Sequence, residues 1–228
     1  MKRILGNLTW KKLIASLLGI LLVGIAVSFN ANASLGNDPV GIVYDGVRNS
    51  ARLTQQQLGT ASNLVNLVLI VLVFLTGRRY INVGTFIYIL PYGFFVDLGG
   101  FLYRTIFLAH PGLSVRSAAA VCGCLLLYIG VGLFVAADIG LDPFTGIVMV
   151  LADRTGKEYR KVKVVFDVCC TILGFVLGGT FGAVTVASAL TAGPCIQFFS
   201  GKFKPFIQDE KKSTEQDQGQ LSRNARAA

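Results

Sequence analysis

Two aspartates that each precede a proline are the residues of this chain best placed to do chemistry. They occur in the stretches Leu35-Gly36-Asn37-Asp38-Pro39 and Ile139-Gly140-Leu141-Asp142-Pro143, each after a long apolar run. Aspartate is a preferred N-cap and proline is favoured at the first helical position, so each motif predicts a helix start. The N-terminus of a helix carries partial positive charge that favours an anionic group. We therefore expect these two Asp-Pro pairs to bind a substrate.

Polar residues beside the two motifs extend this candidate substrate site. Asn32 precedes the first motif and Asp138 precedes the second. The alternative interpretation is structural, because an N-cap aspartate before proline is common in any protein and the flanking residues could simply be solvated.

Further polar residues interrupt apolar segments and form a second candidate group. A carboxylate at the membrane centre costs at least about 2.5–3.5 kcal/mol, so it tends to be paired, protonated or functional. We expect a proton- or cation-coupling role for these positions, or instead an interhelical hydrogen bond worth about 1 kcal/mol. Asp45, three residues from Arg48, is expected to form a surface ion pair. The coupling candidates are Asp97, Asp167, Asn66 and Gln197.

The two Asp-Pro motifs belong to a longer internal correspondence. Gly77 matches Gly178, Thr85 matches Thr185 and Gly93 matches Gly193, which places Asn66 opposite Asp167 and Asp97 opposite Gln197. A duplicated and fused unit explains this, and such repeats are common in transporters. The predicted division is a basic cytoplasmic N-terminus (1–12), membrane repeat 1 (13–108), a connector (109–117), membrane repeat 2 (118–201) and a disordered cytoplasmic tail (202–228).

Each repeat contains four apolar segments, of which the second is short. Residues 40–50 and 144–152 would form helices of only about 14–17 Å, against a hydrocarbon core of about 30 Å. Each short segment therefore predicts a helix that starts within the membrane after a loop that dips in. The predicted fold class is all-α: a polytopic transmembrane bundle from two homologous repeats, each with one short or broken segment.

Loop charges predict the orientation of the segments. Cytoplasmic loops are enriched in Lys and Arg, which predicts both termini and the basic 154–163 loop inside, and both Asp-Pro loops outside. Only Arg78 and Arg79 conflict with this scheme. The pattern favours parallel repeats whose short helices cross the membrane. If the short segments are re-entrant instead, each unit crosses three times and the repeats are inverted.

The N-terminal segment resembles a secretory signal peptide, because a basic start and an apolar run precede Ala31-Asn32-Ala33. The same stretch recurs around residue 138, where no signal peptide can be. We therefore expect the segment to be retained as a membrane helix.

Composition sets the class of protein. Hydrophobic residues make up 53% of the 228 and charged residues 14%, whereas soluble domains carry about 25% charged residues. The lipid bilayer is therefore the expected partner. The net charge of +9 lies in clusters between apolar runs, which argues against nucleic acid. No metal-ligand spacing, cofactor motif or nucleophile–base pair is present, so we expect no metal, no cofactor and no enzymatic activity.

A set of motifs also resembles a known family. The stretch Ala33-Ser34-Leu35-Gly36-Asn37-Asp38-Pro39, then Leu58-Gly59-Thr60-Ala61, Val83-Gly84-Thr85 and a helix with Gly93 and Asp97 is similar to the bacterial YczE-type membrane proteins, which are related to the YitT-type group. The resemblance covers about residues 13–201 and implies a multi-pass protein of the bacterial inner (cytoplasmic) membrane. Phe144 loosely fits the aromatic that this family shows after the Asp-Pro proline, and Val40 departs from it.

Two functions fit this architecture. The first is a small-solute transporter or permease with its site between the repeats. The alternative is a non-transporting scaffold or an accessory subunit of an export or biosynthetic system, and either protein could form a homo-oligomer. Protonatable acids that share one site favour transport, whereas acids that are buried singly in helix contacts favour the scaffold.

Overall fold

A computed structural model describes residues 9–81, 83–107 and 112–227, with side chains described as far as Gln208. Within these ranges the regular elements are all helical, which confirms the all-α prediction. The basic residues at positions 2 and 3 and part of the 109–117 connector lie outside the described residues. The α-helices are α2 (Trp10–Ala33), α3 (Pro39–Ser50), α4 (Leu58–Gly77), α5 (Val83–Ile106), α6 (Leu113–Ala137), α7 (Pro143–Thr155), α8 (Tyr159–Val176) and α9 (Ala183–Ala227).

Five stretches are long and apolar enough to cross a membrane: α2, 55–80, 84–106, α6 and 183–208. Large apolar side chains point away from the bundle, including Leu90 at 80% exposure and Leu190 at 74%. Such a surface suits lipid and not water. The chain is a multi-pass membrane protein.

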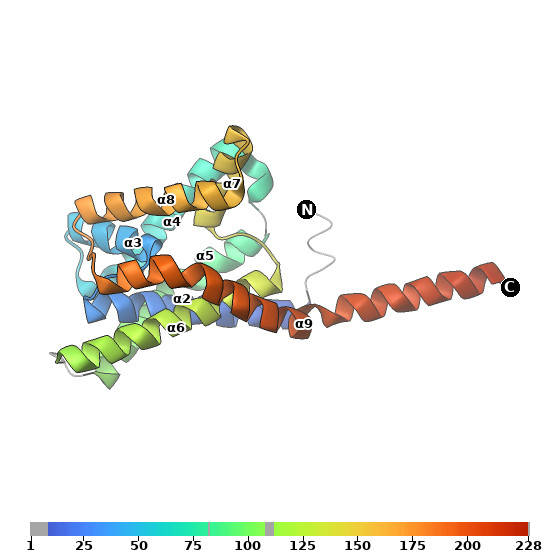
Figure 1. Ribbon diagram of the computed structural model, residues 1–228, viewed down its shortest axis with the longest axis horizontal. Coiled ribbons are helices and arrows are strands. Elements are labelled where there is room, and N and C mark those ends of the chain that lie inside the picture. Colours follow the sequence, from blue (N-terminus) through green and yellow to red (C-terminus); the bar gives the residue numbers. More distant parts are fainter. Residues whose placement is uncertain (1–8, 82, 108–111, 228) are drawn as a thin grey trace.

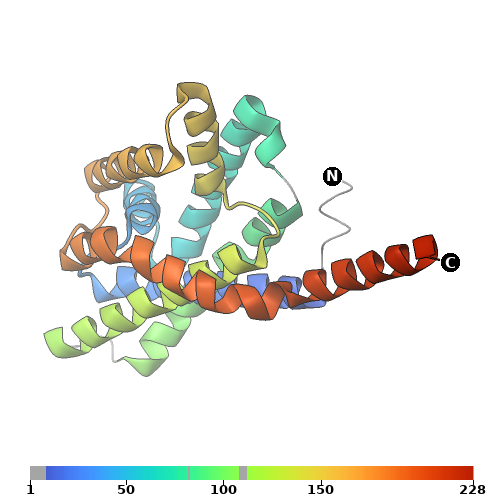
Figure 2. The same ribbon diagram turned by 45° about the vertical axis from the view of Figure 1, so that its right-hand side comes forward.

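Helix α2 packs against α5 and α6, and α6 in turn packs against α9 (Figures 1 and 2). Glycines allow the close approach. A Cβ on Gly19 would lie 2.7 Å from the Gly130 carbonyl oxygen, and one on Gly24 would lie 2.7 Å from Phe95 Cβ. The contacts of α2 with α6 and with α5 therefore require small residues.

The bundle has two ends, which we name by the chain segments that meet there. End A joins residues 33–36, 49–58 and 177–184: Val184 N–H donates to the Leu35 carbonyl, and the Ser50 hydroxyl donates to the Leu177 carbonyl. End B joins residues 76–85, 137–142 and 150–159. There Arg154 donates to the Thr76 carbonyl and the Thr85 hydroxyl donates to the Leu141 carbonyl.

The two short helices do not cross the bundle. Helix α3 follows a loop at end A and returns to end A at Ser50, while α7 follows a loop at end B and returns to end B. Helices of 12 and 13 residues extend only about 18–20 Å. The left-handed residues Ser34 (φ 52°) and Asp138 (φ 50°) turn the chain back into the bundle.

This arrangement corrects the predicted orientation. The sequence favoured crossing short helices and both Asp-Pro loops on one side, whereas the two loops enter from opposite ends. Arg78 and Arg79 then lie at end B with its other basic residues, and Arg79 pairs with Asp153. Their conflict with the loop charges therefore disappears.

The C-terminal segment extends beyond the other helices (Figure 1). Helix α9 continues to Ala227 and so includes most of the predicted tail at 202–228. Most residues of this stretch are good helix formers such as Lys, Gln, Glu and Ala.

Candidate functional site

Both Asp-Pro aspartates are N-caps, as predicted. Asp38 Oδ2 accepts hydrogen bonds from the backbone N–H groups of Val40 (3.2 Å) and Gly41 (3.3 Å). The Asp142 carboxylate accepts from Thr145, at 3.0 Å from its N–H and 2.5 Å from its hydroxyl. Pro39 and Pro143 occupy the first helical position of α3 and α7.

Each Asp-Pro loop is held by the start of a helix distant in sequence. Asn37 N–H donates to the Thr185 hydroxyl oxygen at 3.2 Å, at the start of α9. At the other end the Thr85 hydroxyl, at the start of α5, donates to the Leu141 carbonyl at 2.9 Å. A Cβ on Gly84 would lie 2.4 Å from the Ile139 carbonyl oxygen. These contacts fix where the two helix starts lie.

The two helix starts converge inside the bundle. Tyr88 and Tyr92, one turn apart on α5, each lie within electrostatic range of both Asp38 and Asp142. On α8, Lys163 is likewise within range of both aspartates. The loops therefore enter from opposite ends and bring their carboxylates to one region.

Aromatic rings line this region. Tyr92 stacks on Tyr88 with centroids 5.0 Å apart, and Tyr44 of α3 contacts Tyr92 at 5.8 Å. Phe144, directly after the second Asp-Pro pair, meets Tyr44 edge-on at 5.8 Å and Phe166 at 6.2 Å.

Two buried polar atoms of this region have no partner among the described residues. Asn66, fully buried on α4, accepts a 3.0 Å hydrogen bond from the Tyr44 hydroxyl, but its Nδ2 donates to nothing. Asp38 Oδ1 is equally unpartnered. Buried polar groups are nearly always hydrogen-bonded, so these two atoms are exceptions.

Asp167 lies beside this region and is paired. Lys163 Nζ contacts its two carboxylate oxygens at 2.5 and 2.6 Å. Asp167 is also within electrostatic range of Asp38. The predicted Asn66 and Asp167 therefore join the Asp-Pro residues in one cluster. We call Asp38, Asp142, Asp167, Lys163, Asn66, Tyr44, Tyr88, Tyr92 and Phe144 the central cluster.

The other predicted site residues lie elsewhere. Asp97 accepts from Gly59 N–H at 2.8 Å, at the start of α4 and towards end A. Gln197 is exposed on α9. Asn32 donates to the Ser28 carbonyl within α2 at 2.8 Å, and Asp138 is exposed at end B. The structure therefore leaves these four outside the central cluster.

Sequence reasoning missed the tyrosines and Lys163. Tyr88 and Tyr92 are spaced four residues apart, so they share a helix face, and this was the available signal. Lys163 was assigned to the cytoplasmic basic loop, although it lies within α8 and is only half-exposed.

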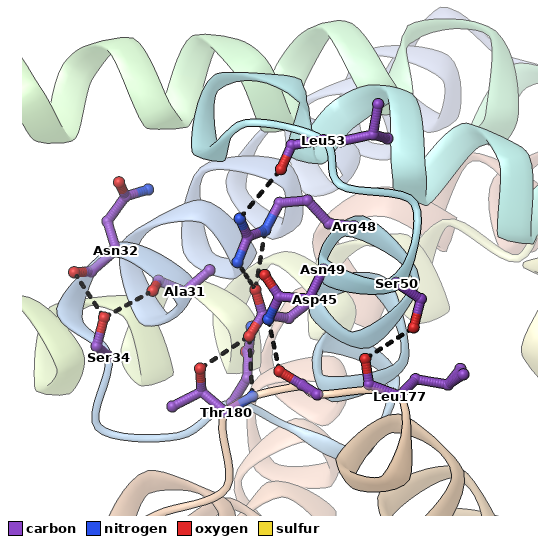
Figure 3. Close-up of polar contacts among 12 residues, drawn as sticks. Ala31, Asn32, Ser34, Asp45, Arg48, Asn49, Ser50, Leu53, Leu177 and Thr180 are labelled. Carbon is purple, nitrogen blue, oxygen red and sulfur yellow. Dashed lines mark hydrogen bonds and ion pairs between the residues drawn. The ribbon is translucent and has the colours of Figure 1, made fainter.

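A buried ion pair closes end A. Asp45 is 2% exposed and accepts two hydrogen bonds from Arg48, at 3.1 and 2.7 Å (Figure 3). It also binds the hydroxyl and N–H of Thr180, in the loop between α8 and α9. The sequence predicted a surface ion pair; the pair exists, but packing against that loop buries it. We call Asp45, Arg48 and Thr180 the end A clasp.

An exposed counterpart lies at end B. Asp153 at the end of α7 is bonded by Tyr80 and Arg79, which follow α4. The hydrogen bond from Tyr80, followed by that from Arg79, holds the pKa of Asp153 below its ordinary value. We call Asp153, Arg79 and Tyr80 the end B clasp. Among the described residues, no group of three His, Cys, Asp or Glu side chains could hold a metal ion.

Comparison with known proteins places the chain in a family. The model of the Family of unknown function (DUF6198) matches residues 10–201. The chain belongs to this family. The chain is also similar to an uncharacterized protein of Haemophilus influenzae, 26% identical over 83% of this chain and 84% of its own length. Another similar protein is the uncharacterized membrane protein YczE of Bacillus subtilis, 23% identical over 84% and 85%.

These findings confirm the predicted resemblance to YczE-type membrane proteins. No solved structure matches the chain significantly.

Proposed function

We propose that this protein is a small-solute transporter whose substrate binds at the central cluster. The observation that carries the proposal is the convergence of Asp38 and Asp142 from opposite ends of the bundle. Half-length helices whose N-termini meet near the membrane centre are a recurring device of secondary transporters. Irregular backbone at membrane depth is tolerated where it is buried in protein or lines a cavity.

The proposal includes two inverted repeats, and pairs of equivalent contacts support them. Thr185 holds the first Asp-Pro loop at Asn37, and Thr85 holds the second at Leu141, the corresponding residue. In the α2–α6 crossing, Gly19 faces Gly130, while Gly123 faces Asn30 and Ala26. By the motif alignment Gly19 corresponds to Gly123 and Ala26 to Gly130. Exchange of the two repeats therefore converts the Gly19–Gly130 contact into the Gly123–Ala26 contact, as a two-fold axis between the repeats requires.

Helix partners follow the same exchange. The short helix α3 packs against α8, and the short helix α7 packs against α4. The C-terminal ends of both are clasped by the connection between the third and fourth helices of the other half. These pairs of contacts fit a two-fold axis that lies in the membrane plane and relates the two halves. Such symmetry would let one half rock against the other around a fixed site.

We further propose that end B is cytoplasmic in the bacterial inner membrane, with both chain ends on that side. The positive-inside rule supports this. End A carries few described basic residues, namely Arg48, Arg52, Arg104 and Arg116. End B carries Lys11, Lys12, Arg78, Arg79, Arg154, Lys157, Arg160, Lys161, Lys202 and Lys204.

The alternative of a scaffold or accessory subunit is favoured by one observation. Asp97 accepts from Gly59 and Asp45 from Arg48 and Thr180, both outside the central cluster, as expected where carboxylates only fix packing. This does not extend to the central cluster, in which Asp38 Oδ1 and Asn66 Nδ2 lack partners.

A test of alternating access needs no known substrate. Val40→Cys, beside Asp38 on a cysteine-free background in proteoliposomes, should react with a small impermeant thiol reagent added from either side. Ser34→Cys and Asp138→Cys are matched controls, each expected to react from one side only. Val40→Cys that reacts from one side only, or from neither, contradicts transport and favours the scaffold.

A further inference from the structure

We propose that the solute bound at the central cluster is a small monovalent organic cation, an ammonium ion with an apolar face. This inference rests on the proposed function and adds the chemical class of the substrate.

The charged side chains of the central cluster determine whether the solute should be positively or negatively charged. Its carboxylates are Asp38, Asp142 and Asp167, and its single cationic side chain is Lys163. Lys163 is committed to Asp167, whose two oxygens it contacts at 2.5 and 2.6 Å. The ion pairs of the described residues include neither Asp38 nor Asp142. Neither carboxylate therefore has a side-chain counter-ion within ion-pair distance.

The helix N-termini offset only part of this charge. Each N-terminus is equivalent to roughly +0.5 elementary charge, so two of them leave about one negative charge against two carboxylates. A buried net charge is costly unless it is compensated. A solute with one positive charge supplies this compensation, whereas an anion would increase the imbalance.

The free polar atoms have suitable chemistry. Asp38 Oδ1 is a buried acceptor with no donor, which an ammonium N–H can satisfy. Asn66 is fully buried, and its side chain points at the cluster, because its oxygen accepts from the Tyr44 hydroxyl. Its Nδ2 is an unpartnered donor, which an ammonium group cannot satisfy, so it can anchor only an accepting atom in the uncharged part of the solute.

The aromatic rings distinguish an organic cation from a metal ion. Tyr44, Tyr88, Tyr92 and Phe144 lie with neighbouring centroids 5.0–5.8 Å apart. Faces of such rings attract ammonium groups, and their apolar area favours a solute with a hydrocarbon part. An inorganic cation would instead need a full shell of oxygen ligands.

The experiment compares three ligands of matched shape on the purified full-length protein. Isothermal titration calorimetry and thermal shift are measured with phenethylamine, neutral 2-phenylethanol and anionic phenylacetate, and separately with NaCl. We expect phenethylamine to bind at least tenfold more tightly than the alcohol, and phenylacetate not to bind. Equal or tighter binding of the alcohol or phenylacetate overturns the inference, as does stabilisation by Na⁺ that the amine does not reproduce.

Variants locate the site. Asp38→Asn keeps an N-cap, since asparagine caps as well as aspartate, and should weaken phenethylamine binding at least tenfold while the protein stays folded. Tyr92→Leu removes an aromatic ring and should also weaken phenethylamine binding. Glu158→Gln, in an exposed ion pair at end B, is the matched charge control and should bind as the wild type does. Wild-type affinity in Asp38→Asn overturns the assignment.

Flux measurements in proteoliposomes test the transport role separately from the cationic class of the solute. Phenethylamine binding at the central cluster without any flux would remove the transport role and leave the cation site standing. Flux of an anion that also protects Val40→Cys would support transport and overturn the cation class.

Discussion

Asp45 of α3 accepts two hydrogen bonds from Thr180, at 2.9 Å from its backbone N–H and 2.8 Å from its hydroxyl. The two residues are 135 positions apart and belong to different halves of the chain. Asp45 also carries the buried ion pair to Arg48. One carboxylate therefore ties the short helix that starts at Asp38 to the loop that leads into α9.

Replacement of Arg48 tests how much the end A clasp contributes to the stability of the protein. Arg48→Met should lower stability by about 3–5 kcal/mol, because it leaves the buried Asp45 charge uncompensated. For a chain of this size the thermal midpoint should fall by roughly 6–20 °C. Lys161→Met breaks the exposed pair with Glu158 and should cost less than about 1 kcal/mol. Equal shifts in the two variants would contradict a stabilising role for the clasp.

The close approach of α3 and α8 predicts a steric effect. A Cβ on Gly174 would lie 2.6 Å from the backbone of Ile42, so Gly174→Ala must force the helices apart and should reduce the yield of folded protein in detergent. Gly193→Ala, with nothing within 4 Å, should be neutral or slightly stabilising, since alanine favours a helix. Size-exclusion profiles that match for both variants would show that α3 and α8 do not pack as described.

Thiol labelling of whole cells tests the opposite entry of the two Asp-Pro loops. Ser34→Cys and Asp138→Cys, on a cysteine-free background, lie at end A and end B. An impermeant maleimide should label Ser34→Cys in intact cells, and Asp138→Cys only after the cells are opened. Labelling of both in intact cells would restore the parallel arrangement and end the inverted one.

The N-terminal helix should be retained. Helix α2 packs against both α5 and α6, so removal of residues 1–33 would take out a packing partner of both helices. Intact-mass spectrometry of the membrane-extracted protein should give about the full-chain 24.4 kDa. A species that begins at Ser34 would show that the segment is a cleaved signal peptide.

Asp97 should act in packing and not in coupling. It accepts from Gly59 N–H at 2.8 Å, so Asp97→Ala should cost about 1.5–3 kcal/mol, the usual worth of a hydrogen bond to a charged group. Binding and flux per folded molecule should stay unchanged, in contrast to Asp38→Asn. Loss of flux in a folded Asp97→Ala protein would return Asp97 to the coupling candidates.

Local signals determined the helices and their starts. The apolar runs predicted a multi-pass helical membrane protein, and the Asp-Pro pairs predicted the N-caps of α3 and α7, because N-capping depends only on adjacent residues. The short length of residues 40–50 and 144–152 predicted that these segments are unusual. The loop charges favoured short helices that cross the membrane, which was wrong, because length and charge alone do not show to which end a short helix returns.

Tertiary structure decided from which end each Asp-Pro loop enters the bundle and which residues form the central cluster. Entry of the loops from opposite ends depends on contacts such as Asn37 to Thr185 and Thr85 to Leu141, between residues far apart in the sequence. The same packing satisfied Asp97 at Gly59 and left Asp38 Oδ1 without a partner. Identical side-chain types therefore acquire different roles, because a carboxylate's role depends on which donors and charges the fold places around it.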